Sequence, residues 1–257
     1  MNRMISSAPS KRASLWLMLG LNVLFFFITQ YPGINLILVP LQIFTTALHE
    51  FGHALMTLAT GGTVTGLTMV PDGEGAGGLT FHSGGIGPLV SSAGYMGAAF
   101  FGSLLIWFGR KEENARAVLK VLGIVFGLCC AFFITPGLLD ARHGGEAWMS
   151  MGIGLLMAAG LVLAGAKLPP SVAHIALLIL GGQTALSSLG DVWYLIEISV
   201  GFSANGSFSD ATNMARYTGI PAAVWSILWG LMSLATVILA LKVSYGREAD
   251  SGGKSHE

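Results

Sequence analysis

The chain has 257 residues, of which 53% are hydrophobic and only 10% are charged. A soluble domain usually carries about a quarter charged residues, so this composition excludes an ordinary soluble domain and indicates an integral membrane protein. The formal net charge is zero, with thirteen basic and thirteen acidic residues, which argues against a nucleic-acid partner.

The apolar segments predict an all-α, multi-pass transmembrane helical bundle of about six to seven spans. The predicted spans are residues 15–29, 34–60, 86–108, 118–134, 148–166, 172–200 and 220–243. We expect them to form a single membrane domain at residues 14–243. A polar N-terminal segment at residues 1–13 and a polar tail at residues 244–257 flank this domain.

A glycine-rich, polar stretch follows the second predicted span. It contains two short candidate strands, Thr63 to Val70 and Gly78 to His82, on either side of Pro71-Asp72-Gly73. This pattern predicts a small β-hairpin beside the preceding helix. The edge of such a hairpin is a place where an extended strand of another chain can pair.

The second predicted span contains His49, Glu50 and His53 in the pattern H-E-x-x-H. Helix residues four apart share a face, so the two imidazoles can bind one zinc ion (Zn2+) while Glu50 reaches water at its open position. A chain of this composition contains the pattern by chance only about 0.004 times. The alternative is that the three side chains satisfy one another between packed helices, but ionisable residues at membrane depth are costly and usually functional.

A catalytic zinc site normally has three protein ligands, so a third must come from elsewhere in the chain. Asp191 is the preferred candidate, because it interrupts the apolar run at residues 185–200 and would be costly there without a cation or a hydrogen-bonding partner. Asp140, which follows the fourth span, is the second candidate, although an aspartate after Pro-Gly usually forms a turn. Asp210 falls in a predicted polar loop at residues 201–217, and His82 lies at the end of the predicted hairpin, beside a loop.

The H-E-x-x-H pattern is the first in a series of short motifs spread over residues 45–242. These motifs are His49-Glu50-Phe51-Gly52-His53-Ala54-Leu55, Thr60-Gly61-Gly62, Gly77-Gly78-Leu79-Thr80, Ser92-Ala93-Gly94-Tyr95-Met96-Gly97, Leu189-Gly190-Asp191-Val192, Ser209-Asp210-Ala211, and Thr218-Gly219-Ile220-Pro221 leading to Trp225 and Trp229. In these motifs and their order, the chain resembles the bacterial and plant members of the site-2-protease group of intramembrane zinc metallopeptidases.

The resemblance implies a membrane-embedded metalloprotease with His49 and His53 as zinc ligands. Glu50 would be the general base that takes a proton from zinc-activated water. Asp191 matches an aspartate that relatives of this branch carry in the sixth span. Better-studied members instead carry the ligand aspartate in an Asn-Pro-Asp-Gly-like segment, which residues 135–140 echo only loosely, without the Asp-Gly pair.

Two other functions are weighed against proteolysis. One is a non-proteolytic membrane scaffold of the same fold, against which the intact His-Glu-His set argues. The other is a metal or proton transporter, which often shows internal repeats that this sequence lacks. The expected partners are the lipid bilayer and a membrane-protein substrate, and the expected location is the inner (plasma) membrane of a bacterium.

Overall fold

The computed structural model describes residue 16, residues 19–25, residue 28, and residues 38–70, 77–199 and 209–245, with the backbone alone for residues 188–199. The elements are α2 (Val39–Ala59), β1 (Thr63–Thr68), β2 (Leu79–Ser83), α3 (Gly87–Gly109), α4 (Glu112–Ile134), η2 (Thr135–Gly137), α5 (Gly144–Lys167), α6 (Pro170–Ser199), α7 (Asp210–Thr218) and α8 (Ala222–Tyr245). The predicted helical bundle with a β-hairpin is confirmed.

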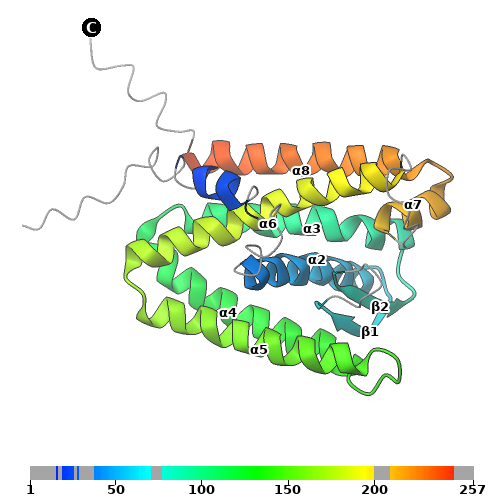
Figure 1. Cartoon of the computed structure of the whole chain (residues 1–257), viewed down its shortest axis with the longest axis horizontal. Helices are drawn as coiled ribbons and strands as arrows, with labels where there is room; N and C mark the ends of the chain where they lie inside the picture. Colours follow the sequence, from blue (N-terminus) through cyan, green and yellow to red (C-terminus); the bar gives the residue numbers. More distant parts are fainter. Residues whose placement is uncertain are drawn as a thin grey trace, which may run out of the picture.

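Five of the described helices, α3, α4, α5, α6 and α8, are long and apolar enough to cross a membrane. Helix α2, with 21 residues, lies between α3 and α4 in the middle of the bundle (Figure 1). Residues 19–25 are helical as well, while the rest of the first predicted span lies largely outside the described residues. The observed helices are therefore consistent with the predicted six to seven spans.

Helix α2 is held on two sides by different kinds of packing. Toward α3, a Cβ on Gly52 would lie 2.2 Å from the carbonyl oxygen of Ala93, so the two backbones touch where only glycine fits. Toward α4, the ring of Phe51 packs against Phe126 with centroids 5.4 Å apart. The closest approach of α2 to α3 thus falls within the H-E-x-x-H segment.

The hairpin is fixed to the bundle rather than free beside it. Strand β1 pairs antiparallel with β2, with a bulge between Val64 and Gly66. Beyond the end of β1, the backbone N–H of Met69 donates to the Ser150 hydroxyl of α5 at 2.9 Å. A Cβ on Gly66 would lie 3.0 Å from the Cα of Gly137 in η2. The hairpin is therefore anchored against α5 and η2 on the side away from α2.

The prediction of a polar loop at residues 201–217 is wrong for its second half, where the chain forms helix α7. Residues 201–208 lie outside the described part. The N-cap of α7 is Ser209, whose hydroxyl accepts from the N–H of Thr212 at 3.2 Å, while the Thr212 hydroxyl accepts from the N–H of Ser209. This reciprocal capping satisfies N–H groups that a short helix leaves unpaired. The helix ends at Gly219, whose φ of 72° is left-handed.

Candidate metal centre

Helix α2 presents His49 and His53 toward α3, one helical turn apart. Their Nε2 atoms lie 3.0 Å from each other. The Nδ1 atom of His53 lies 2.7 Å from the carbonyl oxygen of Val90 in α3. Because a carbonyl oxygen can only accept, Nδ1 of the neutral ring carries the hydrogen and Nε2 keeps a free lone pair. Such a backbone contact is the usual way in which a metal-binding histidine is oriented.

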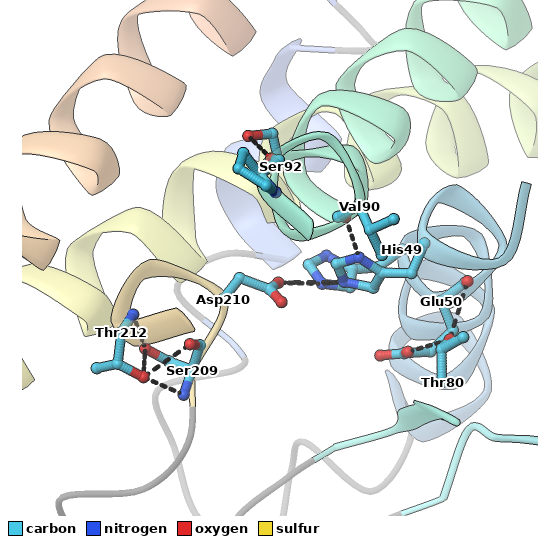
Figure 2. A network of polar contacts seen from close by, with 10 residues as sticks. His49, Glu50, Thr80, Val90, Ser92, Ser209, Asp210 and Thr212 are labelled. Carbon is cyan, nitrogen blue, oxygen red and sulfur yellow. Dashed lines mark hydrogen bonds and ion pairs between the residues drawn. The ribbon is translucent and has the colours of Figure 1, made fainter. Parts of the chain in front are cut away.

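Asp210, the first residue of α7, brings a carboxylate to the two imidazoles (Figure 2). Its Oδ2 atom lies 3.1 Å from Nε2 of His49 and 3.1 Å from Nε2 of His53. Among the His, Cys, Asp and Glu residues with described side chains, these three form the group that could hold a metal ion. The group joins an early helix of the chain to a late one.

The three atoms form a triangle with sides of 3.0–3.1 Å, which hydrogen bonds alone explain poorly. Each Nε2 has only one hydrogen or one lone pair in the ring plane, so it cannot make well-directed hydrogen bonds to both of the other two atoms. A cation bound by all three satisfies them at once. Zinc bonds of about 2.0–2.1 Å in a tetrahedral site place ligand atoms about 3.3–3.4 Å apart, close to the observed spacing. Two imidazoles and a carboxylate are also a donor set that zinc accepts.

The space next to this triangle is open because residue 94 is a glycine. A Cβ on Gly94 would lie 2.3 Å from Nε2 of His49 and 2.4 Å from Nε2 of His53. Any other side chain would therefore occupy the position that both imidazoles face. The glycine leaves room for an ion and a further ligand, and this fit supports metal binding independently of the donor chemistry.

Glu50 lies beside the histidines on α2, toward the hairpin (Figure 2). It is buried, and its Oε2 atom accepts a hydrogen bond of 2.7 Å from the hydroxyl of Thr80 in β2. The same hydroxyl lies 3.1 Å from the backbone oxygen of Glu50. The hairpin thus provides a hydrogen bond to Glu50, the residue that follows His49 in the sequence.

Helix α7 is held in place by apolar and aromatic packing against α3 and α8. Ala211 and Met214 on its buried side cluster with Tyr95 of α3 and Trp229 of α8. The rings of Tyr95 and Trp229 stack with centroids 5.3 Å apart, and Tyr95 meets the ring of His49 edge-on at 4.7 Å. The cluster that positions the aspartate therefore also supports one of the histidines.

The far end of α7 is fixed by two further contacts. The indole N–H of Trp225 donates to the Thr218 hydroxyl at 3.0 Å. The ring of Tyr217 covers Gly87 at the start of α3, where a Cβ would lie 2.4 Å from the ring. With both ends anchored, the short helix is a rigid support for its first residue.

The structure brings together three of the residues singled out by the sequence, His49, Glu50 and His53, but it does not bring Asp140 to them. The Oδ1 atom of Asp140 accepts from the N–H groups of Arg142 at 2.8 Å and His143 at 2.9 Å, just before α5. These two backbone donors, His143 first, hold the pKa of this exposed carboxyl below its ordinary value. Asp140 is therefore a turn residue, as its position after Pro-Gly predicts.

Asp191, the preferred third ligand, lies in α6, but its side chain is outside the described residues, so this prediction stays a prediction. The backbone places it in a relevant region. Helix α6 touches α3 where a Cβ on Gly102 would lie 2.4 Å from the backbone nitrogen of Ala185. Residue 191 lies six positions, or about 9 Å, further along the same helix. In this direction α6 runs toward the end of the bundle where α7 lies (Figure 1).

Asp210 is the residue that sequence reasoning left in a loop. Its neighbourhood carried two local signals: Ser209 and Thr212 at capping-box spacing, and apolar residues at positions 211 and 214, one turn apart. Together these predict a short helix that begins with an aspartate. Neither signal says where the helix docks, since that depends on the aromatic cluster between α3 and α8.

The fold and the site define an integral membrane protein with several spans and a partly buried group that could hold a metal ion. A family model described as Peptidase M50B-like matches residues 18–240, and the chain belongs to this family, which is of the site-2-protease type. This membership confirms the resemblance seen in the motifs and supports a protease. No curated protein and no solved structure matches the chain.

Proposed function

We propose that the protein is a membrane-embedded zinc metalloprotease that hydrolyses peptide bonds of membrane proteins in or near the bilayer. The zinc ligands in this proposal are His49, His53 and Asp210. The observation that carries it is the triangle of two Nε2 atoms and one Oδ2 atom, 3.0–3.1 Å apart, beside the open space at Gly94.

Zinc, when bound, supplies Lewis-acid chemistry, because it acidifies water and polarises a peptide carbonyl. The chain's own residues do the rest. Glu50 accepts the proton as the water oxygen attacks the carbonyl carbon, and it returns that proton to the amine when the C–N bond breaks. Val90 keeps the ring of His53 oriented through its carbonyl oxygen, and Tyr95 supports the ring of His49.

A substrate helix must be partly unwound before cleavage, because its carbonyls are hydrogen-bonded internally in lipid. Strand β2 is a suitable binding place for the unwound segment, because Thr80 on this strand contacts Glu50. An extended segment that pairs along the hairpin would pass close to the general base. The bilayer itself contacts the exposed apolar side chains of the spans, such as Leu128, Leu156 and Leu231. The resemblance to bacterial members supports the plasma membrane of a bacterium as the location.

The test compares wild type with Glu50→Gln, both purified in detergent and analysed for bound zinc. Each is incubated with a detergent extract of bacterial membrane proteins, and new peptide N-termini are identified by mass spectrometry. We expect equal zinc content in the two proteins and new N-termini, in or beside predicted spans, with wild type alone.

Three outcomes would contradict the proposal. Zinc-loaded wild type that produces no more new N-termini than Glu50→Gln would favour the scaffold. Zinc that moves across the membrane of reconstituted vesicles with wild type, but not with His53→Ala, would favour the transporter. A protein that binds no zinc at the site would remove the chemistry on which the proposal depends.

A further inference from the structure

We propose that Thr80 is a positioning residue that fixes the carboxylate of Glu50 from the hairpin. For the reaction it serves, this inference rests on the proposed function. The contact itself is a property of the fold, and it joins two elements: Glu50 is on α2 and Thr80 is on β2. It gives the hairpin a second role besides offering an edge to a substrate.

The hydroxyl of Thr80 has one hydrogen and two acceptors within reach. It lies 2.7 Å from Oε2 of Glu50 and 3.1 Å from the backbone oxygen of the same residue. The 2.7 Å contact has the usual O–H···O length, whereas the 3.1 Å contact is longer than the usual range. The hydrogen therefore points to Oε2, which leaves the orientation of the carboxylate tied to the strand.

The segment from Gly78 to Thr80 runs along the side chain of Glu50. Gly78 lies just before β2, two positions before Thr80. A Cβ on Gly78 would lie 3.1 Å from the Cγ of Glu50 and 2.7 Å from the methyl group of Thr46. The segment therefore has no side chain at Gly78, where the Cγ of Glu50 passes, and it has the hydroxyl of Thr80 beside the carboxylate of Glu50.

Thr80 is itself held rigidly, which a positioning residue requires. It pairs across the hairpin with Leu67, which is fully buried. Strand β1 is in turn anchored by the hydrogen bond from Met69 to Ser150 of α5. The hydroxyl is therefore placed by the bundle and not by Glu50, so it can restrict the rotation of the carboxylate.

The first experiment measures the contact without depending on activity. A double-mutant cycle compares the thermal unfolding midpoints of the full-length protein in detergent for wild type, Thr80→Val, Glu50→Ala and the double variant. We expect Thr80→Val to lower the Tm by about 2–6 °C in wild type and by less than half as much in Glu50→Ala. Thr63→Val is the matched control, because its hydroxyl is exposed on the same hairpin, and it should show no coupling to Glu50.

The second experiment separates positioning from substrate binding. For a membrane-protein substrate that wild type cleaves, Thr80→Val should lower kcat by roughly tenfold to a hundredfold with KM and zinc content unchanged. Thr80→Ser, which keeps the hydroxyl, should restore kcat to within about threefold of wild type.

The outcomes that overturn the inference differ from those that overturn the proposed function. Additive Tm changes in the cycle, or a raised KM with unchanged kcat, would show that Thr80 does not position Glu50, whatever the protein catalyses. A failure of Thr80→Ser to restore kcat would do the same. Lack of cleavage by zinc-loaded wild type would remove the protease, while the cycle would still decide whether the contact exists.

Discussion

The helix pairs α4–α5 and α2–α3 are both packed through glycines, but only the α2–α3 pair has imidazole nitrogens beside a glycine. Between α4 and α5, a Cβ on Gly123 would lie 2.7 Å from the carbonyl oxygen of Ala158. Between α2 and α3, a Cβ on Gly52 would lie 2.2 Å from the carbonyl oxygen of Ala93. Both pairs bring backbones into contact in the way that small residues allow in membranes.

The difference lies in a second glycine of the α2–α3 pair. Gly94 faces two imidazole nitrogens, whereas a Cβ on Gly123 would meet the backbone of Ala158 and the backbone and side chain of Val162. Close packing therefore builds a helix pair in both places, but a glycine opposite donor atoms also leaves a polar space. The comparison predicts that glycine substitutions in the two pairs have different consequences.

The largest effect should come from breaking the donor set itself. Asp210→Asn removes the carboxylate charge that faces both imidazoles, so we expect the zinc affinity to fall by more than about 100-fold. The measurement is zinc content by mass spectrometry after equilibration at defined free zinc. Asp140→Asn is the matched control, because that carboxylate binds only backbone N–H groups, and it should leave the zinc affinity unchanged.

Asp191→Asn, measured in the same way, decides between the two aspartates. If this variant loses zinc and Asp210→Asn retains it, the third ligand is Asp191 and the proposed ligand set is wrong.

The next effect sharpens the comparison between the glycines. Gly94→Ala places a methyl group within 2.4 Å of both Nε2 atoms, so zinc content should fall to less than about a tenth of wild type. Gly123→Ala should instead lower the Tm by about 3–10 °C through overpacking, with zinc content unchanged. Equal loss of zinc in both variants would show that Gly94 acts through the fold and not through the space beside the imidazoles.

A smaller effect is expected from loosening the support of α7. Trp225→Phe removes the hydrogen bond to Thr218 but keeps an aromatic ring, so α7 should hold its aspartate less firmly. We expect a roughly threefold to tenfold loss of zinc affinity, measured by competition with a chelator. Trp148→Phe changes an exposed tryptophan of α5 and should have no effect. Unchanged zinc affinity in Trp225→Phe would mean that the apolar cluster alone positions α7.

The smallest effect concerns the pH dependence of stability. Because backbone N–H groups lower the pKa of Asp140, its carboxylate stabilises the folded state above its unfolded pKa of about 3.9. This stabilisation is lost as the pH falls through the still lower folded pKa. The Tm of Asp140→Asn should therefore be below that of wild type at pH 6 and approach it at pH 3. An equal difference at both pH values would exclude this linkage.

The sequence was most informative where function and structure depend on local spacing. The H-E-x-x-H pattern predicted two imidazoles on one helix face because four residues make about one turn, and His49 and His53 do lie together. The hairpin at residues 63–83 followed from glycines and strand-forming residues between two spans. Apolar length predicted the spans, although their ends shifted by several residues, most of all where α4 begins within a charged stretch.

The position of Asp210 beside the two histidines could not be predicted in this way, because it is set by contacts between distant segments. Hydropathy favoured Asp191, since an aspartate inside an apolar run is costly. It gave no reason to favour Asp210, whose segment is polar and short. What brings Asp210 to the histidines is the packing of Ala211 and Met214 against Tyr95 and Trp229, and no local pattern encodes that contact.

The candidate metal centre has one further consequence for biosynthesis, which follows from the order of its ligands along the chain. His49 and Asp210 are 161 positions apart, and α3, α4, α5 and α6 lie between them. A nascent chain that has inserted only its first half thus contains His49 and His53 but not Asp210. The candidate metal centre can therefore be assembled only after the start of α7 has been synthesised, so the proposed protease would acquire its metal-binding group late in translation.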